Sequence, residues 1–297
     1  MNDRAKFADP QVESLLPPIT FTRRGFLASG AFSGFALAAG PVMAQTAIHT
    51  SADGLDAADI KVPTSDGKEM PAYYAMPAKG NKHHVVVVIP EVFGLHEYQK
   101  DICRRLAHAG YYGITLDPFF RQGVLAQMTD MKEVMAAANS LDDTTMYADM
   151  DSLVAYIEKQ PKADSKHMGI TGMCRGGRTV WMTIAHSKKF LTGVAWYGGL
   201  TPAPPTITAT PFDIVDQLNA PVLGLYGGAD AGMPQPMIED MEKKLKASSD
   251  KNAKASSIHI YPGTPHAFHA DYRPSYRKEA AEDGWKRMLA WFKQHGV

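Results

Sequence analysis

The sequence predicts an α/β fold in which helices cover both faces of a mostly parallel sheet. Two observations predict it. Short apolar stretches alternate along the chain with longer stretches of helical periodicity, which is typical of α/β proteins. One of the short stretches, 85–89, consists only of valine and isoleucine, as expected of a strand that is buried on both faces.

The elements follow in order from the amino-terminal side. Residues 45–57 are small and polar and predict a linker, and 58–297 then forms one domain. Stretches 60–62 and 72–76 flank a Ser-Asp-Gly turn and predict a β-hairpin. Further strands are expected at 85–89, 113–116, 167–171, 194–197, 222–226 and 258–261, and helices at 97–108, 131–140, 147–159, 179–187, 237–246 and 276–293.

The first 44 residues predict a twin-arginine signal peptide rather than part of the fold. Arg23 and Arg24 precede a weakly apolar run at 26–40, and Val42-Met43-Ala44 resembles a cleavage site with the cut before Gln45. The run is shorter than the roughly 20 residues that a membrane span needs. The alternative is an uncleaved amphipathic helix. The pattern predicts a periplasmic or secreted protein that meets the twin-arginine translocase and is not inserted in the membrane after cleavage.

Charge and cysteine content exclude several classes. The chain carries 31 basic and 31 acidic residues, so nothing indicates a nucleic acid or an acidic membrane surface as partner. Its two cysteines, Cys103 and Cys174, do not make a disulfide framework.

The most informative motif is Gly172-Met173-Cys174-Arg175-Gly176-Gly177, which follows a predicted strand and precedes a predicted helix. A nucleophile between glycines on a strand-to-helix turn is typical of the nucleophile elbow of α/β-hydrolases. Here the nucleophile is a thiol. A helix N-terminus favours the thiolate, which is the reactive form.

Other polar residues follow the ends of predicted strands, where α/β folds bind ligands. Glu91 follows 85–89, Asp230 follows 222–226, and His266 follows 258–261. Nucleophile, Asp and His occur in hydrolase order, so His266 is expected to move the thiol proton and Asp230 to orient His266. The backbone amides of Val92 and Arg175 are candidates for the oxyanion hole. Glu91 is a candidate for altering the protonation of the thiol.

Each candidate also has a structural interpretation. A cysteine is often a small buried hydrophobe, and an aspartate is common in turns. His269 competes with His266 for the role of base. The two histidines could also suggest a metal, but no further ligand stands at a fitting spacing, so neither a metal nor a cofactor is expected.

Together these motifs resemble the dienelactone hydrolase (carboxymethylenebutenolidase) family from about residue 58 to the C-terminus. The matching segments, in order, are Glu91-Val92-Phe93-Gly94, Asp117 to Gly123, the elbow, Gly227 to Asp230 and Tyr261 to Phe268. The resemblance implies an α/β-hydrolase fold and a Cys174–His266–Asp230 triad. It also implies that Glu91 helps to generate the thiolate when substrate binds.

The resemblance further implies that Arg121 reads a substrate carboxylate, with Phe93 beside the substrate. Guanidinium suits that task because it pairs with a carboxylate through two hydrogen bonds. One departure concerns a second carboxylate-binding arginine, which family members place four residues after the triad histidine. This chain has Ala270 there, and Arg273 and His269 are the alternatives.

The sequence therefore predicts an enzyme that hydrolyses a small ester or lactone through an acyl-thioenzyme. Two other classes stay open. One is an exported binding protein that keeps the hydrolase fold without turnover. The other is a thiol redox protein, which would require pairing of Cys103 with Cys174.

Overall fold

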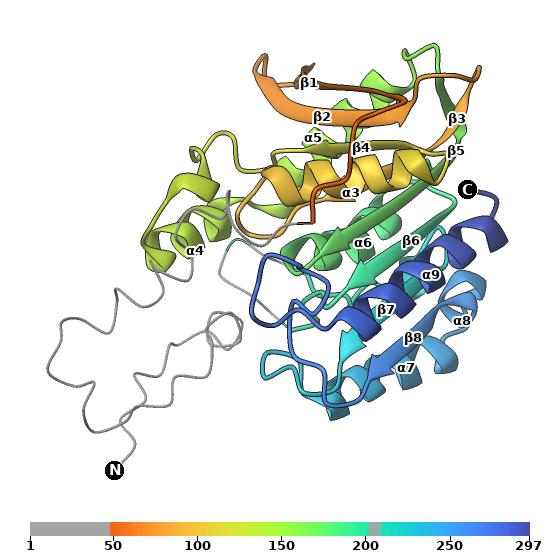
Figure 1. Cartoon of the computed structure of the whole chain (residues 1–297). Coiled ribbons are helices and arrows are strands. Elements are labelled where there is room, and N and C mark those ends of the chain that lie inside the picture. The colour runs from red at the N-terminus through yellow and green to blue at the C-terminus, as the bar shows by residue number, and fades with distance from the viewer. Residues whose placement is uncertain (1–47, 202–205, 207–208) are drawn as a thin grey trace, which may run out of the picture.

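The structure is a computed structural model of the whole chain, and it describes residues 48–201, 206 and 209–297. Within these residues a single eight-stranded sheet has the order β1-β2-β4-β3-β5-β6-β7-β8 (Figure 1). β1 (Leu55–Pro63) and β2 (Glu69–Pro77) form the predicted hairpin, and β2 is also antiparallel to β4 (Tyr112–Leu116). All other neighbours pair in parallel, so the predicted mostly parallel sheet is confirmed.

The parallel strands direct their carboxyl ends to one edge of the sheet. They are β3 (His83–Ile89), β4, β5 (Ala163–Met173), β6 (Thr192–Trp196), β7 (Val222–Gly227) and β8 (Ser257–Tyr261). Parallel pairing needs a crossover connection, which here is usually a helix. The loops after β3, β5, β7 and β8 therefore meet at one edge, and these loops hold the predicted site residues except Arg121, which follows β4.

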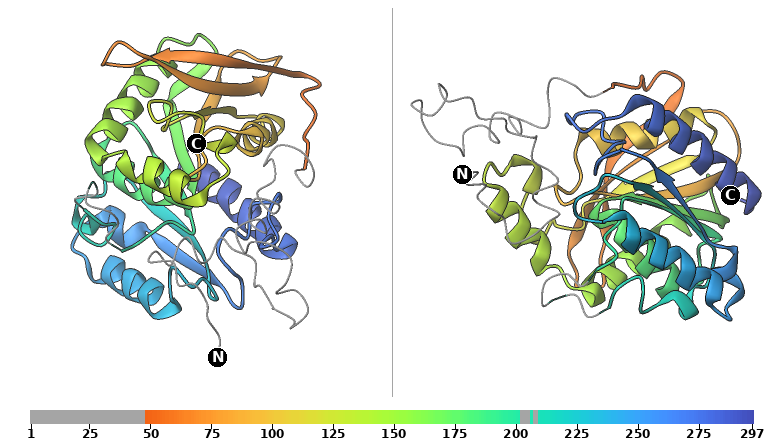
Figure 2. Two further views of the ribbon diagram at one scale, coloured as in Figure 1. Left: turned by 90° about the vertical axis from the view of Figure 1, so that its left-hand side faces the viewer. Right: turned by 90° about the horizontal axis from the view of Figure 1, so that it is seen from below.

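Helices cover both faces of the sheet, as predicted (Figures 1 and 2). α3 (Glu97–His108) and α9 (Lys278–Gln294) lie on one face. α5 (Asp143–Ile157), α6 (Arg175–His186) and α7 (Gln235–Ala247) lie on the other. The remaining helical segments are α4 (Met131–Ser140), α8 (Lys251–Ala255) and two 3₁₀ turns, η1 (Leu125–Gln127) and η2 (Val215–Gln217).

Three helices, α5, α6 and α7, begin earlier than the sequence predicts, and the reasons are identifiable for α5 and α6. The first turn of α5 is capped by Asp142, whose carboxylate accepts a hydrogen bond from the Thr145 amide at 2.7 Å. α6 begins directly after Cys174, although Gly176 and Gly177 are poor helix formers. A Cβ on Gly176 would lie 2.3 Å from the Ile89 carbonyl oxygen, so close packing requires glycine there.

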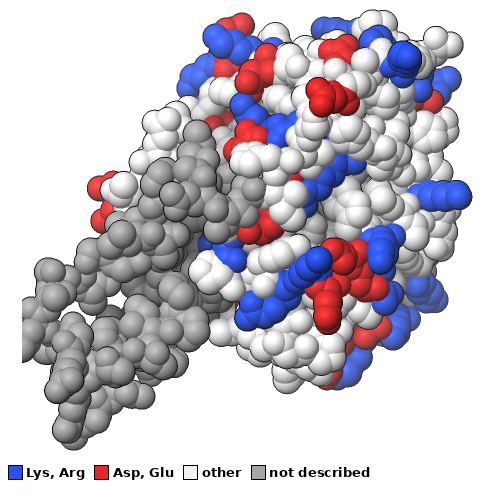
Figure 3. Space-filling view, viewed as in Figure 1, with Lys and Arg blue, Asp and Glu red and all other residues white. Residues whose placement is uncertain are grey.

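The amino-terminal segment is described only in part. The predicted signal peptide, 1–44, lies outside the described residues. β1 begins at Leu55, so the last three residues of the predicted linker belong to the sheet. None of the helices in the described ranges combines the length and the apolar character needed to cross a bilayer. Figure 3 shows acidic and basic side chains interspersed over the visible face, in keeping with the balanced composition.

Candidate active site

The elbow holds Cys174 in a strained conformation between β5 and α6. Its φ of +54° and ψ of −118° are rare for any residue other than glycine. The Cys174 amide donates to the Trp196 carbonyl at 3.0 Å, which anchors the turn to β6. The side chain is buried at the start of α6, where unpaired backbone amides stabilise negative charge. The backbone geometry of a nucleophile elbow is therefore present.

Asp230 and His266 form a buried pair, as their positions after β7 and β8 predict. The Nδ1–H of His266 donates to Oδ2 of Asp230 at 2.6 Å. The other oxygen, Oδ1, accepts the backbone amides of Gly232 and Met233 at 2.9 and 3.3 Å. These bonds fix the carboxylate and place the proton of the neutral ring on Nδ1. His266 Nε2 is buried and has no hydrogen-bond partner among the described residues, so it is free to take a proton.

Charge around His266 favours its protonated form. Burial lowers the pKa of His266, but the charges of Asp230 and Cys174 outweigh burial and raise it well above its usual value. For Asp230 the directions are opposite. Burial raises the pKa of this carboxyl, but the charge and hydrogen bond of His266 outweigh burial and bring the pKa below its usual value. The Asp230 carboxylate therefore stabilises the positive charge that forms on His266 when its Nε2 takes up a proton.

Two further strained residues surround the pair. Ala267, next to His266, has a φ of +56°, and Tyr197, at the end of β6, has a φ of +38°. The Tyr197 ring packs edge-on against the His266 ring at a centroid distance of 5.0 Å. Backbone strain of this kind persists only where surrounding contacts enforce it, and it concentrates at functional sites. All three non-glycine residues with positive φ in the described chain therefore lie at this edge of the sheet.

Glu91 is fully buried and does not stand free beside the thiol. It accepts a hydrogen bond from the Tyr272 hydroxyl, and Arg273 Nη2 lies 3.8 Å from Glu91 Oε2. The second oxygen, Oε1, has no hydrogen-bond partner among the described residues. The side chain is thus held by two residues of the loop after His266, with one oxygen unused.

Arg273 is a buried cation with unused donors. Its side chain is 9 % exposed, and Nε and Nη2 have no hydrogen-bond partner among the described residues. The guanidinium stacks over the Phe93 ring at 4.9 Å and over the Tyr272 ring at 5.1 Å. Cys174 is close enough for its charge to act on Arg273. A buried guanidinium with free donors can bind an anionic group.

Arg121 occupies a different setting from the one expected. Its guanidinium contacts Asp149 at 2.6 and 2.8 Å and Asp66 at 3.0 and 3.2 Å. Two carboxylates therefore already take its donors. The expectation that Arg121 reads a substrate carboxylate stays a prediction, and a substrate would have to displace both carboxylates to bind there. Arg273, one of the two alternatives, is the arginine with free donors.

The segments that carry the expected oxyanion donors are packed together. Val92 lies in a turn closed by the Gly94 amide, which donates to the Glu91 carbonyl at 3.1 Å. Arg175 is the first residue of α6. Gly176 abuts the carbonyls of Ile89 and Pro90, so the loop of Val92 and the first turn of α6 are adjacent. Their amides remain candidates for the oxyanion hole.

His269 and Cys103 belong to the core. His269 Nδ1 lies 2.6 Å from the Tyr98 hydroxyl, and burial lowers the pKa of His269 to about 3. His266 and not His269 therefore pairs with Asp230. Cys103 is buried in α3, and both cysteines are free. The pairing that a thiol redox protein would need is absent from the described structure.

Sequence reasoning missed Tyr272 and Tyr197. Tyr272 lies six residues after His266, in a loop without regular structure, and its bond to Glu91 spans 181 positions of the chain. Tyr197 directly follows β6, so its position at the carboxyl end of a parallel strand was the available signal.

Comparison with known proteins gives matches that cover most of the chain. The model of the dienelactone hydrolase family matches residues 70–296. A protein of Methylorubrum extorquens named "Putative carboxymethylenebutenolidase" is 43 % identical over 97 % of this chain and 98 % of its own. A protein of Escherichia coli with the same name is 43 % identical over 89 % of this chain and 96 % of its own. The crystal structure titled "Putative Dienelactone Hydrolase" from Klebsiella pneumoniae superposes with a TM-score of 0.76 at 40 % identity, covering 81 % of this chain and 99 % of that one.

Proposed function

The chain belongs to the dienelactone hydrolase family and has its α/β-hydrolase fold, and from this premise we propose that it hydrolyses a small ester or lactone through a Cys174–His266–Asp230 triad. The observation that carries the proposal is the buried His266–Asp230 pair, with its free Nε2, beside a cysteine strained on an elbow. A binding protein without turnover would not need an orienting carboxylate, a free imidazole nitrogen and a strained thiol at one edge.

The mechanism follows from these positions. His266 Nε2 takes the thiol proton, and the thiolate attacks the substrate carbonyl. The amides of Val92 and Arg175 stabilise the oxyanion, and His266 returns the proton to the leaving oxygen. Water then cleaves the thioester with His266 as base.

The substrate class that fits the site carries a negative charge. Arg273 is buried, and its Nε and Nη2 have no hydrogen-bond partner among the described residues. A substrate carboxylate would satisfy those donors and loosen the 3.8 Å contact of Arg273 with Glu91. Glu91 would then be free to act on the thiol, so that the nucleophile is activated when the correct substrate binds.

Matched substrates test this proposal. We expect purified protein to hydrolyse esters and lactones that bear a free carboxylate better than their neutral analogues. In Arg273→Met, the kcat/KM for anionic substrates should fall by about 10–100-fold, as expected when a charge-assisted hydrogen bond is lost. Neutral substrates serve as the control and should change little. Equal losses on both classes would contradict the anion-reading role, and unchanged activity in Cys174→Ala would contradict the mechanism.

We also propose export by the twin-arginine route to the periplasm. The support is the order of Arg23-Arg24, an apolar run and Val42-Met43-Ala44 in the printed sequence. The test is the intact mass of the protein purified from a periplasmic fraction. This mass should match a chain that begins at Gln45. Replacing both arginines by lysine should leave the precursor in the cytoplasm. Periplasmic protein that keeps residues 1–44, or export that survives the double replacement, would refute the proposal.

A further inference from the structure

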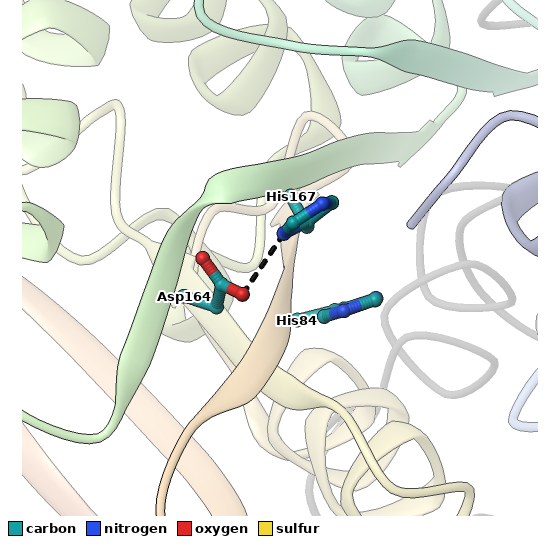
Figure 4. A group of neighbouring side chains, drawn as sticks. All are labelled: His84, Asp164 and His167. Carbon is teal, nitrogen blue, oxygen red and sulfur yellow. Dashed lines mark hydrogen bonds and ion pairs between the residues drawn. The ribbon is translucent and has the colours of Figure 1, made fainter.

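A cluster of two imidazoles and a carboxylate lies away from the active site. Among the described residues, His84, Asp164 and His167 form a group whose potential ligand atoms all lie within 4.8 Å of one another. Figure 4 shows that His84 comes from β3, and Asp164 and His167 come from β5. The cluster occupies the amino-terminal ends of these strands. Glu91 and Cys174 follow their carboxyl ends, so roughly 20 Å of strand separates the two places.

An irregularity in the sheet creates the cluster. His84 is paired with Asp164, but the next residue of β3, Val85, is paired with Met168. Three residues of β5, including His167, therefore bulge out between two ladder positions. Bulges re-aim side chains, and this one turns His167 back toward both Asp164 and His84.

The contacts within the cluster leave ring nitrogens available. His167 Nδ1 lies 2.9 Å from Asp164 Oδ2, and the Lys166 amide donates to Asp164 Oδ1 at 3.3 Å. The rings of His84 and His167 stack with centroids 4.5 Å apart and planes 17° apart. Among the described residues, neither nitrogen of His84 nor Nε2 of His167 takes part in a hydrogen bond. An oriented carboxylate beside two imidazoles is the arrangement in which proteins hold zinc, with the carboxylate as ligand or as partner of a ligating histidine.

We propose that His84, Asp164 and His167 form a binding site for a first-row transition ion, with Zn²⁺ as the reference metal. Imidazole and carboxylate ligands suit this class of ion better than Ca²⁺ or Mg²⁺, which require mostly oxygen ligands. Ligand atoms around a tetrahedral zinc lie roughly 3.3 Å apart, so the partly exposed side chains close in by up to about 1.5 Å. The ion clamps β3 to β5, the two strands that lead to Glu91 and Cys174.

Zinc titration of the full chain tests the site. The titration uses Cys174→Ser protein, because a thiol near an imidazole would itself take up zinc. Competition with a chromophoric chelator should give one equivalent of bound Zn²⁺. Excess Zn²⁺ at about 100 times the dissociation constant should raise the Tm by roughly 5–10 °C. Absence of stoichiometric binding would overturn the proposal.

Substitutions in the same background locate the ion. His84→Ala, His167→Ala and Asp164→Asn should each weaken zinc binding by about tenfold or more. The matched control is His186→Ala, which removes another imidazole–carboxylate pair, His186 Nε2 to Asp151 Oδ2 at 3.1 Å, that lacks a second imidazole. This variant should bind as the parent does. Equal affinity in the His84 or His167 variant, or an equal loss in the control, would place the ion elsewhere.

Anomalous diffraction from zinc-soaked crystals of the unsubstituted chain gives a second measurement that needs no variant. The proposal requires a peak about 2.0–2.2 Å from nitrogens of both His84 and His167. A peak only at Cys174 or at another residue would overturn it. Both measurements are independent of turnover, so failure of the metal site leaves the proposed hydrolysis untouched.

Discussion

A methyl group added at Gly176 should displace the loop that carries Glu91. The Cβ of Gly176→Ala would lie 2.3 Å from the Ile89 carbonyl oxygen and 2.6 Å from that of Pro90. Ordinary contact begins at 3.4 Å, so one backbone must retreat from the other by about 1 Å. Pro90 directly precedes Glu91 and Val92, and Gly176 is the second residue after Cys174.

The expected loss is kinetic more than thermodynamic. A displacement of about 1 Å between a nucleophile and its oxyanion donors can lower kcat about 100-fold. Overpacking costs about 1–3 kcal/mol, which lowers the Tm of a domain of this size by roughly 2–4 °C per kcal/mol. The assay is hydrolysis of an activated aryl ester, with Tm measured on the same preparation.

Gly193→Ala is the matched control. Its Cβ would lie 2.7 Å from Val180 Cγ1 and 3.2 Å from Ile184 Cγ1, so it meets movable side chains instead of backbone. Gly193 lies near the start of β6, away from the carboxyl edge of the sheet. This variant should lose a similar amount of stability and keep its kcat. A folded Gly176→Ala protein with a kcat within about twofold of the parent would refute the reasoning.

Two further predictions concern proton positions. Asp230→Asn should lower kcat by up to about 10⁴-fold without unfolding the protein, because the wrong tautomer of His266 is then favoured. Steady-state kinetics measures the loss, and circular dichroism checks that the variant is folded. A loss of kcat under tenfold would contradict this prediction. Burial lowers the pKa of His96 to about 3, and that of His269 likewise, so both stay neutral when folded and take up protons when unfolded below about pH 6.5. The free energy of unfolding should therefore fall as pH drops from 6.5 toward 3, by about 2 kcal/mol per histidine at pH 5. In His96→Phe, measured by urea unfolding at several pH values, the fall should be smaller by the contribution of one histidine. An unchanged dependence of the unfolding free energy on pH would contradict this prediction.

The fold could be predicted, and the triad could be proposed, because local patterns carry both. The apolar run of β3, the glycines of the elbow and the hydrolase order of Cys174, Asp230 and His266 are all visible without a structure. Helix starts were less accurate, since Gly176 and Gly177 suggest a turn until their close packing on β3 and β6 is known. The bulge in β5 was missed because register depends on the partner strand.

Contacts between distant segments could not be predicted. The motif around Arg121 resembles that of the carboxylate-binding arginine of the family. In the structure Arg121 forms ion pairs with Asp66 and Asp149, and the local sequence does not predict these partners. Arg273 and Tyr272 reach Glu91 across the whole chain from an irregular loop. Which arginine has free donors is a property of the packed structure.

In the proposed mechanism, Cys174 carries the acyl group during turnover. Its most direct test is intact-mass spectrometry after rapid mixing with an activated aryl ester, followed by peptide mapping. The account predicts a transient mass increase equal to one acyl group, located on the peptide with Cys174 and absent in Cys174→Ala. Two results together would contradict this mechanism. The unsubstituted protein would turn over the ester under single-turnover conditions with no adduct on Cys174, and Cys174→Ala would keep full activity.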